Sequence, residues 1–117
     1  MTLDTKRDNP HAPAVAVDFD GTLCTNNWPD IGQPNELAIE HLKNRQENGW
    51  KLILWTCRAG EALDAAVNWC AEHGLHFDAV NENLPERIEY FGGDCRKISA
   101  DEYWDDRALH ISAEVMI

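Results

Sequence analysis

The hydrophobic positions of the chain form short continuous runs, and polar or amphipathic segments separate these runs. Each run is bounded by glycine or polar residues, as in strands that are buried on both faces of a parallel sheet. The continuous runs predict strands over residues 14–17 and 50–55, and two further strands, which contain acidic residues, are expected over residues 77–80 and 100–104. The pattern is typical of an α/β protein in which strands and helices alternate.

The segments between these runs predict helices. Residues 35–48 are rich in helix-forming residues and are followed by Gly49, a residue type that commonly ends a helix. Residues 60–73 carry apolar side chains at positions i, i+3, i+4 and i+7, which places them on one helical face. Pro85 opens a shorter helical stretch that continues towards Tyr90, before two glycines break it.

The segment between residues 24 and 34 predicts a loop, because it contains two prolines, a glycine and several polar turn-forming residues. It leaves the end of the first predicted strand, so we expect it to fold over that end as a small flap. Trp28 either caps the space below this flap or packs beneath it. Packing is the simpler of the two interpretations.

The length of 117 residues allows one core but not a second sizeable domain. We expect residues 1–13, which are polar and contain proline, to form a flexible arm without the apolar core of a signal peptide. Residues 14–117 would form a single domain. Because connections between parallel strands are right-handed, we expect helices on both faces of the sheet, in a three-layer α/β/α, Rossmann-like arrangement.

Composition and charge exclude several classes of partner. The formal net charge of −11 repels polyanions and leaves no basic patch of the kind that nucleic-acid-binding proteins carry. No apolar run approaches the roughly 20 residues of a membrane span. The four cysteines have no CxxC spacing, so we expect reduced thiols, a cytoplasmic location and no zinc site.

Polar groups follow three of the predicted strands. Asp18 and Asp20 come after the first, Thr56 after the second, and Asp105 and Asp106 after the last. The carboxyl ends of parallel strands share one edge of the sheet, where ligands bind in open α/β proteins. Clustered acids repel one another unless a cation binds, and oxygen ligands suit Mg²⁺. The turn after the threonine adds backbone N–H groups near a helix start, which can hold a phosphate.

The sequence DFDGTL at residues 18–23 resembles the first motif of the haloacid dehalogenase-like superfamily, which is DxDGT followed by an apolar residue. The later order is also similar: an apolar strand that ends in threonine, then a lysine, then a strand that ends in two acids. An acid pair followed by arginine most resembles the small capless phosphatases of the superfamily. The resemblance extends from Val15 to Arg107, and the segments between the motifs are too short for a substantial cap domain.

The resemblance implies a Mg²⁺-dependent phosphohydrolase that cleaves a phosphate monoester through an aspartyl-phosphate intermediate. Asp18 would be the nucleophile, and Asp20 the general acid that protonates the leaving oxygen and then activates water. The metal would be bound by the Asp18 carboxylate, the backbone carbonyl of Asp20 and the Asp105 carboxylate. Asp106 would contact it directly or through another ligand.

The resemblance also implies which residues hold the phosphate. Thr56 would bind phosphate oxygens together with the adjacent turn, which contains Cys57 and Arg58. The lysine of the superfamily neutralises the nucleophile and the phosphate, and Lys97 is its counterpart here. Lys97 lies just before the last predicted strand, which places it towards the opposite edge of the sheet unless the chain doubles back. Arg58 is the alternative cation.

Other functions and substrates remain open. A phospho-accepting receiver domain also combines acids, threonine and lysine, but its acid pair lies on the first strand and its phospho-accepting aspartate in mid-chain. A catalytically silent binding domain would retain only the fold. The substrate is expected to be a phosphorylated small molecule or macromolecule. A polynucleotide terminal phosphate is an alternative that the net charge of −11 disfavours.

Self-association is a further expectation. The tail after the last predicted strand is short, and its apolar end at residues 115–117 would be exposed on a monomer. A symmetric homodimer would cover this stretch and could roof the site.

Overall fold

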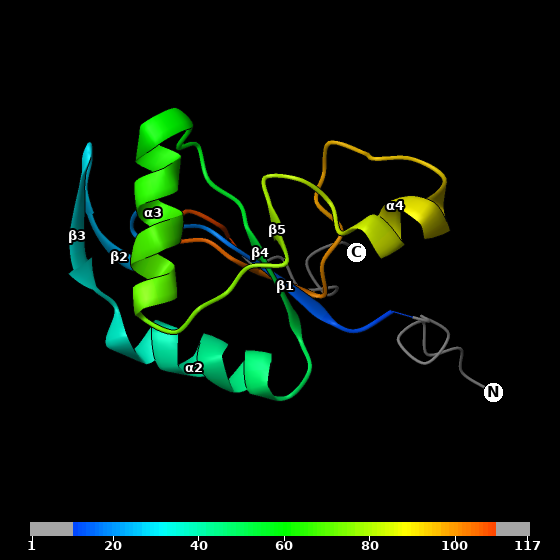
Figure 1. Ribbon diagram of the computed structural model, residues 1–117, viewed down its shortest axis with the longest axis horizontal. Helices are drawn as coiled ribbons and strands as arrows, with labels where there is room; N and C mark the ends of the chain where they lie inside the picture. Colours follow the sequence, from blue (N-terminus) through cyan, green and yellow to red (C-terminus); the bar gives the residue numbers. More distant parts are fainter. Residues whose placement is uncertain (1–10, 110–117) are drawn as a thin grey trace.

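A parallel sheet forms the centre of the computed structural model, which describes residues 11–109 (Figure 1). Its strands are β1 (Ala14–Val17), β4 (Lys51–Leu54), β5 (Ala79–Val80) and β6 (Glu102–Trp104). Their order across the sheet is β5-β4-β1-β6. Val17 at the end of β1 lies opposite Leu54 on one side and Trp104 on the other, so three strands end at the same level. The α/β class expected from the sequence is confirmed.

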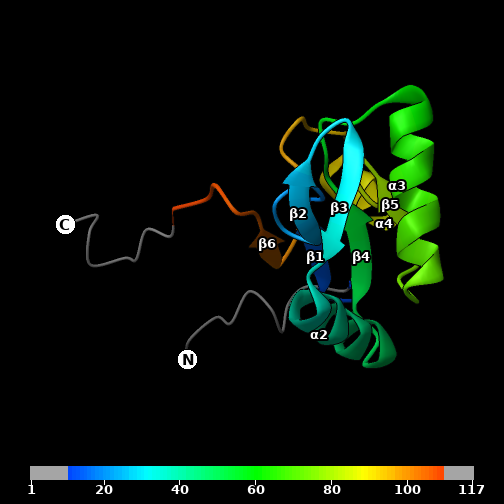
Figure 2. The ribbon, with the colours of Figure 1, turned by 90° about the vertical axis from the view of Figure 1, so that its left-hand side faces the viewer.

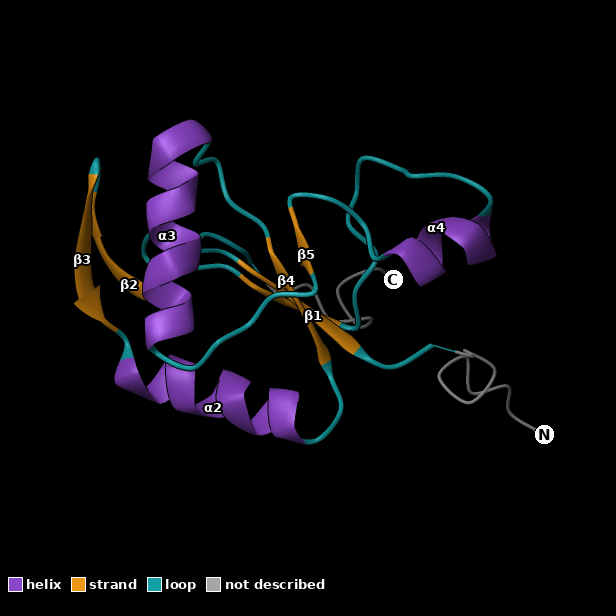
Figure 3. Ribbon diagram, viewed as in Figure 1, coloured by secondary structure: helices purple, strands orange, loops and turns teal. Residues whose placement is uncertain are grey.

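Helices occupy the connections that the sequence pattern indicated (Figure 3). In the described residues they are α2 (Glu36–Glu47), α3 (Gly60–Glu72) and α4 (Pro85–Phe91). The side-chain oxygen of Asn35 caps α2 by accepting a hydrogen bond from the backbone N–H of Ala38 at 3.2 Å. Gly92 ends α4 in the left-handed conformation, with a φ of 77°.

Hydrophobic side chains pack against both faces of β1. Its residues point alternately to opposite faces, and all four are buried. Val15 and Val17 belong to a core that also contains residues of α2 and α3. Ala14 and Ala16 belong to a second core that contains Leu84, the residue before α4. β1 is therefore buried on both sides, as its continuous apolar run predicts.

The segment between residues 24 and 34 is an antiparallel hairpin, so the expectation of a loop is wrong (Figure 2). Its strands are β2 (Cys24–Asn27) and β3 (Asp30–Pro34). The prolines lie in the turn, after Trp28, and at the last position of β3, where a strand tolerates the loss of an N–H donor. Gly32 permits the close pairing, because a Cβ there would lie 2.1 Å from the backbone oxygen of Thr25. The hairpin stands beside α3, at the opposite end of the molecule from α4 (Figure 1).

β5 and β6 each begin two residues later than predicted, and an aspartate side chain takes part in the pairing just before each of them. Asp78 precedes β5, and its carboxylate accepts a hydrogen bond from the backbone N–H of Leu52 at 2.9 Å. Asp101 precedes β6, and its carboxylate accepts one from the backbone N–H of Ala14 at 2.8 Å. The buried Arg87 of α4 donates to the same carboxylate at 2.8 Å. Regular strand pairing begins only after each aspartate.

Some expectations concern residues beyond this description. Most of the predicted N-terminal arm and the apolar stretch at residues 115–117 lie outside residues 11–109. Within that range, none of the helices has the length and apolar character needed to cross a membrane.

Candidate metal and phosphate site

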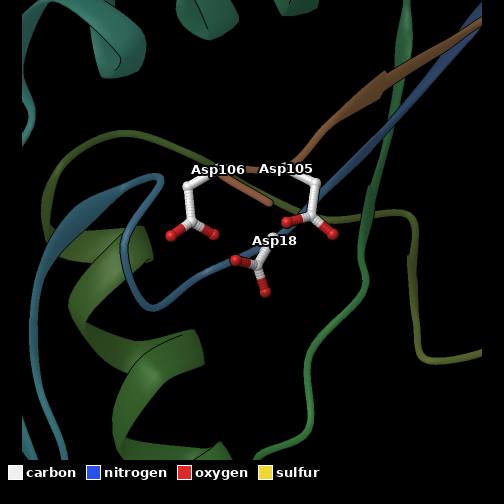
Figure 4. A group of neighbouring side chains, drawn as sticks. All are labelled: Asp18, Asp105 and Asp106. Atoms are coloured by element: carbon white, nitrogen blue, oxygen red, sulfur yellow. The ribbon is translucent and has the colours of Figure 1, made fainter. Parts of the chain in front are cut away.

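Three carboxylates meet where the neighbouring strands β1 and β6 end (Figure 4). Asp18 follows β1, and Asp105 and Asp106 follow β6. One carboxylate oxygen from each of the three lies within 4.8 Å of the others. The backbone N–H of Asp18 donates to the carbonyl of Trp104 at 2.8 Å, so the strand pairing continues up to this point. The structure thus brings together three of the four aspartates predicted as metal ligands.

The environment of Asp18 disfavours its ionised form. The pKa of its carboxyl is raised to about 6, chiefly by burial and next by the charge of Asp105, with a smaller contribution from Asp106. Hydrogen bonds from the backbone N–H of Phe19 and the hydroxyl of Thr22 lower this pKa but are outweighed. A cation would relieve the repulsion, and three carboxylate oxygens form a donor set suited to a hard ion such as Mg²⁺.

Thr22 connects Asp18, which follows β1, with Asp106, which follows β6. Its hydroxyl donates to Oδ2 of Asp18 at 3.3 Å and accepts a hydrogen bond from the backbone N–H of Asp106 at 3.0 Å. One hydroxyl can do both, because it has one donor and two acceptor positions. Thr22 belongs to the DFDGTL motif, so the signal was present in the sequence, although no role was assigned to the residue. It positions the carboxylates of both strand ends.

Gly21 allows Asp106 to approach the turn after β1. Its φ is +87°, and a Cβ at this position would lie 2.4 Å from Oδ2 of Asp106. We therefore expect Gly21→Ala to weaken Mg²⁺ binding at least tenfold, since the methyl group displaces Asp106, and to destabilise the fold by about 1–3 kcal/mol through backbone strain. Magnesium titration and thermal unfolding measure the two effects.

A glycine with the same backbone conformation but no neighbour at the Cβ position is the matched control: Gly49 has a φ of +86°, and a Cβ there meets no atom within 4 Å, so Gly49→Ala shares the backbone strain but not the contact with Asp106. It should leave magnesium affinity unchanged. Equal magnesium affinity in the Gly21→Ala protein and the parent would show that the contact with Asp106 does not shape the site.

Asp20 directs its side chain away from the three carboxylates. It forms a bidentate ion pair with Arg58, in which Oδ2 accepts from Nε and Oδ1 from Nη2, both at 2.8 Å. Only 2% of the Arg58 side chain and 19% of the Asp20 side chain are exposed. In this arrangement Asp20 can offer a metal only its backbone carbonyl, which is the group that the resemblance implies.

All five N–H donors of the Arg58 guanidinium have partners within the protein. Besides the two bonds to Asp20, it donates to the backbone oxygens of Asp30 at 2.9 Å, Pro29 at 3.3 Å and Ala62 at 3.5 Å. The pKa of Arg58 is raised, chiefly by the hydrogen bond to Asp20. Arg58 has no donor left for a phosphate unless one of these contacts opens. It joins the hairpin, the end of β1 and the start of α3.

The turn after β4 contains Thr56 and Cys57, two of the predicted phosphate ligands. The side-chain oxygen of Asn81 accepts a hydrogen bond from the backbone N–H of Thr56 at 2.8 Å. The Thr56 hydroxyl accepts from the backbone N–H of Arg58 at 3.1 Å and can still donate to a ligand. α3 begins at Gly60 without a side-chain cap, so its first N–H groups can face an anion. Asn81, the residue after β5, supports this turn, a role that was not predicted from the sequence.

Lys97 lies alongside β6 and outside the three-carboxylate group. Its Nζ is 5.7 Å from the centre of the Tyr103 ring, and that ring lies 6.0 Å from the ring of Trp55. Tyr103 precedes Asp105 by two residues, so the lysine lies beside the strand that ends at the carboxylates. Its role as the neutralising cation remains a prediction.

A cavity of about 270 Å³ lies between the hairpin and the turn after β4. Its lining residues are Asp20, Asn26, Trp28, Cys57 and Arg58. Trp28 is 58% exposed, so the interpretation that it packs beneath the hairpin is wrong. The guanidinium carbon of Arg58 lies 4.9 Å from the centre of the Trp28 ring, so the ring packs on this cation at the cavity wall.

Comparisons with known proteins place the chain beside one solved structure. No protein-family model matches it, and neither does any curated protein. A structure of the conserved protein coded by a locus of Bacteroides thetaiotaomicron is similar, with a TM-score of 0.74 and 43% sequence identity. The similarity covers 85% of this chain and 79% of that one. The chain therefore belongs to the same family as this conserved protein of Bacteroides thetaiotaomicron.

Proposed function

We propose that this protein is a Mg²⁺-dependent phosphomonoesterase of the haloacid dehalogenase-like type, without a sizeable cap domain. The observation that carries the proposal is the meeting of Asp18, Asp105 and Asp106 at the ends of β1 and β6. The Thr56 turn and the uncapped start of α3 follow the neighbouring strand β4. Acids for a metal and donors for a phosphate therefore lie at the carboxyl ends of adjacent parallel strands, where α/β enzymes bind ligands.

The strand order supports this proposal over a receiver domain. Numbered along the parallel sheet alone, β5-β4-β1-β6 is 3-2-1-4, and its switch point lies between β1 and β6. Receiver domains have the order 2-1-3-4-5, in which the first strand lies between the second and the third. The cores on both faces of β1 support the three-layer α/β/α arrangement.

The residues present fit a magnesium ion. Asp18, Asp105 and the backbone carbonyl of Asp20 would hold it directly, and Asp106 would contact it directly or through another ligand; all of them supply the hard oxygen donors that Mg²⁺ prefers. When bound, the ion would neutralise charge on the carboxylates and on the phosphoryl oxygens.

In the first step that we propose, the Asp18 carboxylate attacks phosphorus and forms an aspartyl-phosphate. The bond between phosphorus and the alcohol oxygen breaks, and Asp20 gives its proton to that oxygen. Thr56 and the N–H groups at the start of α3 bind the phosphoryl oxygens. Lys97 is the proposed additional cation.

In the second step, water attacks phosphorus and Asp20 takes the proton of the water. The bond to Asp18 breaks, so free phosphate leaves and the carboxylate is restored. Both Asp20 oxygens are engaged by Arg58 at 2.8 Å in the structure. One of these contacts has to open when Asp20 carries its proton, which makes Arg58 a positioning residue for the general acid.

The test of this proposal is metal-dependent phosphate release. The purified protein should liberate phosphate from small monoesters with Mg²⁺ and should lose this activity when a chelator removes the metal. Phosphorylated metabolites, a phosphopeptide and a 3′- or 5′-phosphorylated oligonucleotide compare the substrate classes. We expect the oligonucleotide to be the poorest, because the net charge of −11 repels it. If phosphate is released from none of these substrates, the result favours the catalytically silent binding domain instead.

The two aspartates after β6 should differ in their effects on the metal. We expect Asp105→Asn to raise the Mg²⁺ concentration needed for half-maximal activity at least a hundredfold, and Asp106→Asn to raise it about tenfold, because a direct ligand contributes more than a supporting one. Magnesium titration of activity measures both. Asp64→Asn, on the exposed side of α3, is the control. An unchanged requirement in Asp105→Asn would move the direct contact to Asp106.

A further inference from the structure

We propose that the cavity between the hairpin and the Thr56 turn binds the leaving group of the substrate and selects an alcohol that carries a single neutral aromatic ring system. The inference rests on the proposed phosphatase function and names its substrate class. Trp28 is the specificity-determining residue of this cavity.

The position of Asp20 locates the leaving group. A general acid has to lie within hydrogen-bond reach of the oxygen that it protonates, so the alcohol lies on the Asp20 side of the phosphorus. Asp20 lines the cavity, whereas Asp18, Asp105 and Asp106 do not. A phosphate held between Asp18 and the Thr56 turn would therefore direct its alcohol towards Trp28 and Arg58.

The charges of the lining favour a neutral group. Arg58 is the cation of the lining, and Asp20 neutralises it through the bidentate ion pair. The remaining lining residues, Asn26, Trp28 and Cys57, add no cation to the cavity. A second phosphate or a carboxylate on the alcohol would thus find no unpaired cation in the cavity, and its desolvation would oppose binding.

The aromatic wall and the size of the cavity favour one flat ring system. The Trp28 ring is held by the Arg58 guanidinium at 4.9 Å, while 58% of its surface stays exposed. A ring already fixed in place stacks on a ligand with little further loss of entropy. A volume of about 270 Å³ is at the lower end for ligand pockets, which suits one ring system better than an oligonucleotide or a folded protein.

Asn26 adds a polar contact at the rim. Its side-chain oxygen accepts a hydrogen bond from the backbone N–H of Trp28 at 3.3 Å, which orients the turn that carries the indole. The amide nitrogen of the same side chain is left as a donor for a polar substituent on the ring.

A pair of esters with similar leaving groups tests the inference. Benzyl phosphate and cyclohexylmethyl phosphate both release a primary alcohol of similar size, so their kcat/KM ratio reports recognition of the ring. We expect the parent protein to prefer benzyl phosphate about fivefold. Trp28→Ala should reduce the ratio to about one, and Trp28→Phe should retain most of the preference. Tyr90→Ala is the control, because Tyr90 is 56% exposed on α4 and does not line the cavity.

Binding of benzyl alcohol without phosphate separates this inference from the proposed function. Saturation-transfer NMR should detect the alcohol on the parent protein and on Tyr90→Ala, but not on Trp28→Ala. Hydrolysis of both esters with the same ratio in Trp28→Ala and the parent would overturn the inference and leave the phosphatase function intact. Hydrolysis of neither ester, with benzyl alcohol still bound through Trp28, would overturn the phosphatase function alone. If Trp28→Ala and Trp28→Phe both bind benzyl alcohol and both keep the preference for benzyl phosphate, the cavity is not the site that binds the leaving group.

Discussion

Asp18→Asn should lower kcat for phosphate monoesters by about four orders of magnitude or more, because the amide cannot form the aspartyl-phosphate on which both steps depend. Steady-state phosphate release with saturating Mg²⁺ measures the loss. Mass spectrometry of the protein quenched in acid during turnover should detect one added phosphoryl group in the parent and none in the variant. A variant that retains a rate near that of the parent would contradict the assignment of Asp18 as nucleophile.

The stability of the same variant tests whether unfolding causes this loss of activity. The pKa of Asp18 is raised to about 6 in the folded protein, above its ordinary value of 3.8, so its ionised form destabilises the metal-free fold above pH 6. This cost disappears as the pH falls from about 6 to about 3.8, because the carboxyl group becomes protonated. Asp18→Asn should therefore stabilise the metal-free protein at pH 7 by about 1 kcal/mol, a figure that allows for solvent screening of a half-exposed carboxylate. Thermal unfolding in the presence of a chelator measures it.

Arg58→Met should destabilise the protein by about 3 kcal/mol, because it leaves the Asp20 carboxylate and three backbone oxygens without their donors. For a chain of this length the loss corresponds to a fall of roughly 10 °C in Tm. The methionine retains the stem of the side chain, so the effect reports the guanidinium rather than a cavity. Denaturant unfolding at neutral pH gives the free energy directly.

Arg45→Met is the matched control, since Arg45 also forms a bidentate pair, with Glu102, at 3.0 and 3.1 Å. That pair is much more exposed, at 31% and 34% of the two side chains, and should contribute less than about 1 kcal/mol. A similar loss of unfolding free energy in Arg45→Met and Arg58→Met would show that burial of the Arg58 pair does not determine its contribution to stability. Asp20→Asn combined with Arg58→Met should recover part of the stability, because the unpaired charge is removed.

The carboxylate cluster could be predicted from the sequence, whereas the contact of Arg58 with both Asp20 and the hairpin could not. Asp18 follows a strand that a continuous apolar run marks as buried, Asp105 follows the last predicted strand, and parallel strands bring their carboxyl ends to one edge. Their proximity could therefore be inferred from two local patterns and the alternation of strands and helices. The ion pair of Asp20 with Arg58 could not, because it joins residues 38 positions apart that no motif relates.

The sequence by itself determined the features that depend on neighbouring residues: the buried central strand, the helices with their glycine ends, and the strand ends that carry aspartates. Local periodicity and turn chemistry are sufficient for these. Only the tertiary structure decided which partner each polar side chain takes. The Thr22 bridge between Asp18 and Asp106 and the engagement of all five Arg58 donors depend on segments that are distant in the sequence. Each of these groups has several possible partners of equal chemistry, and the packing of the fold selects one.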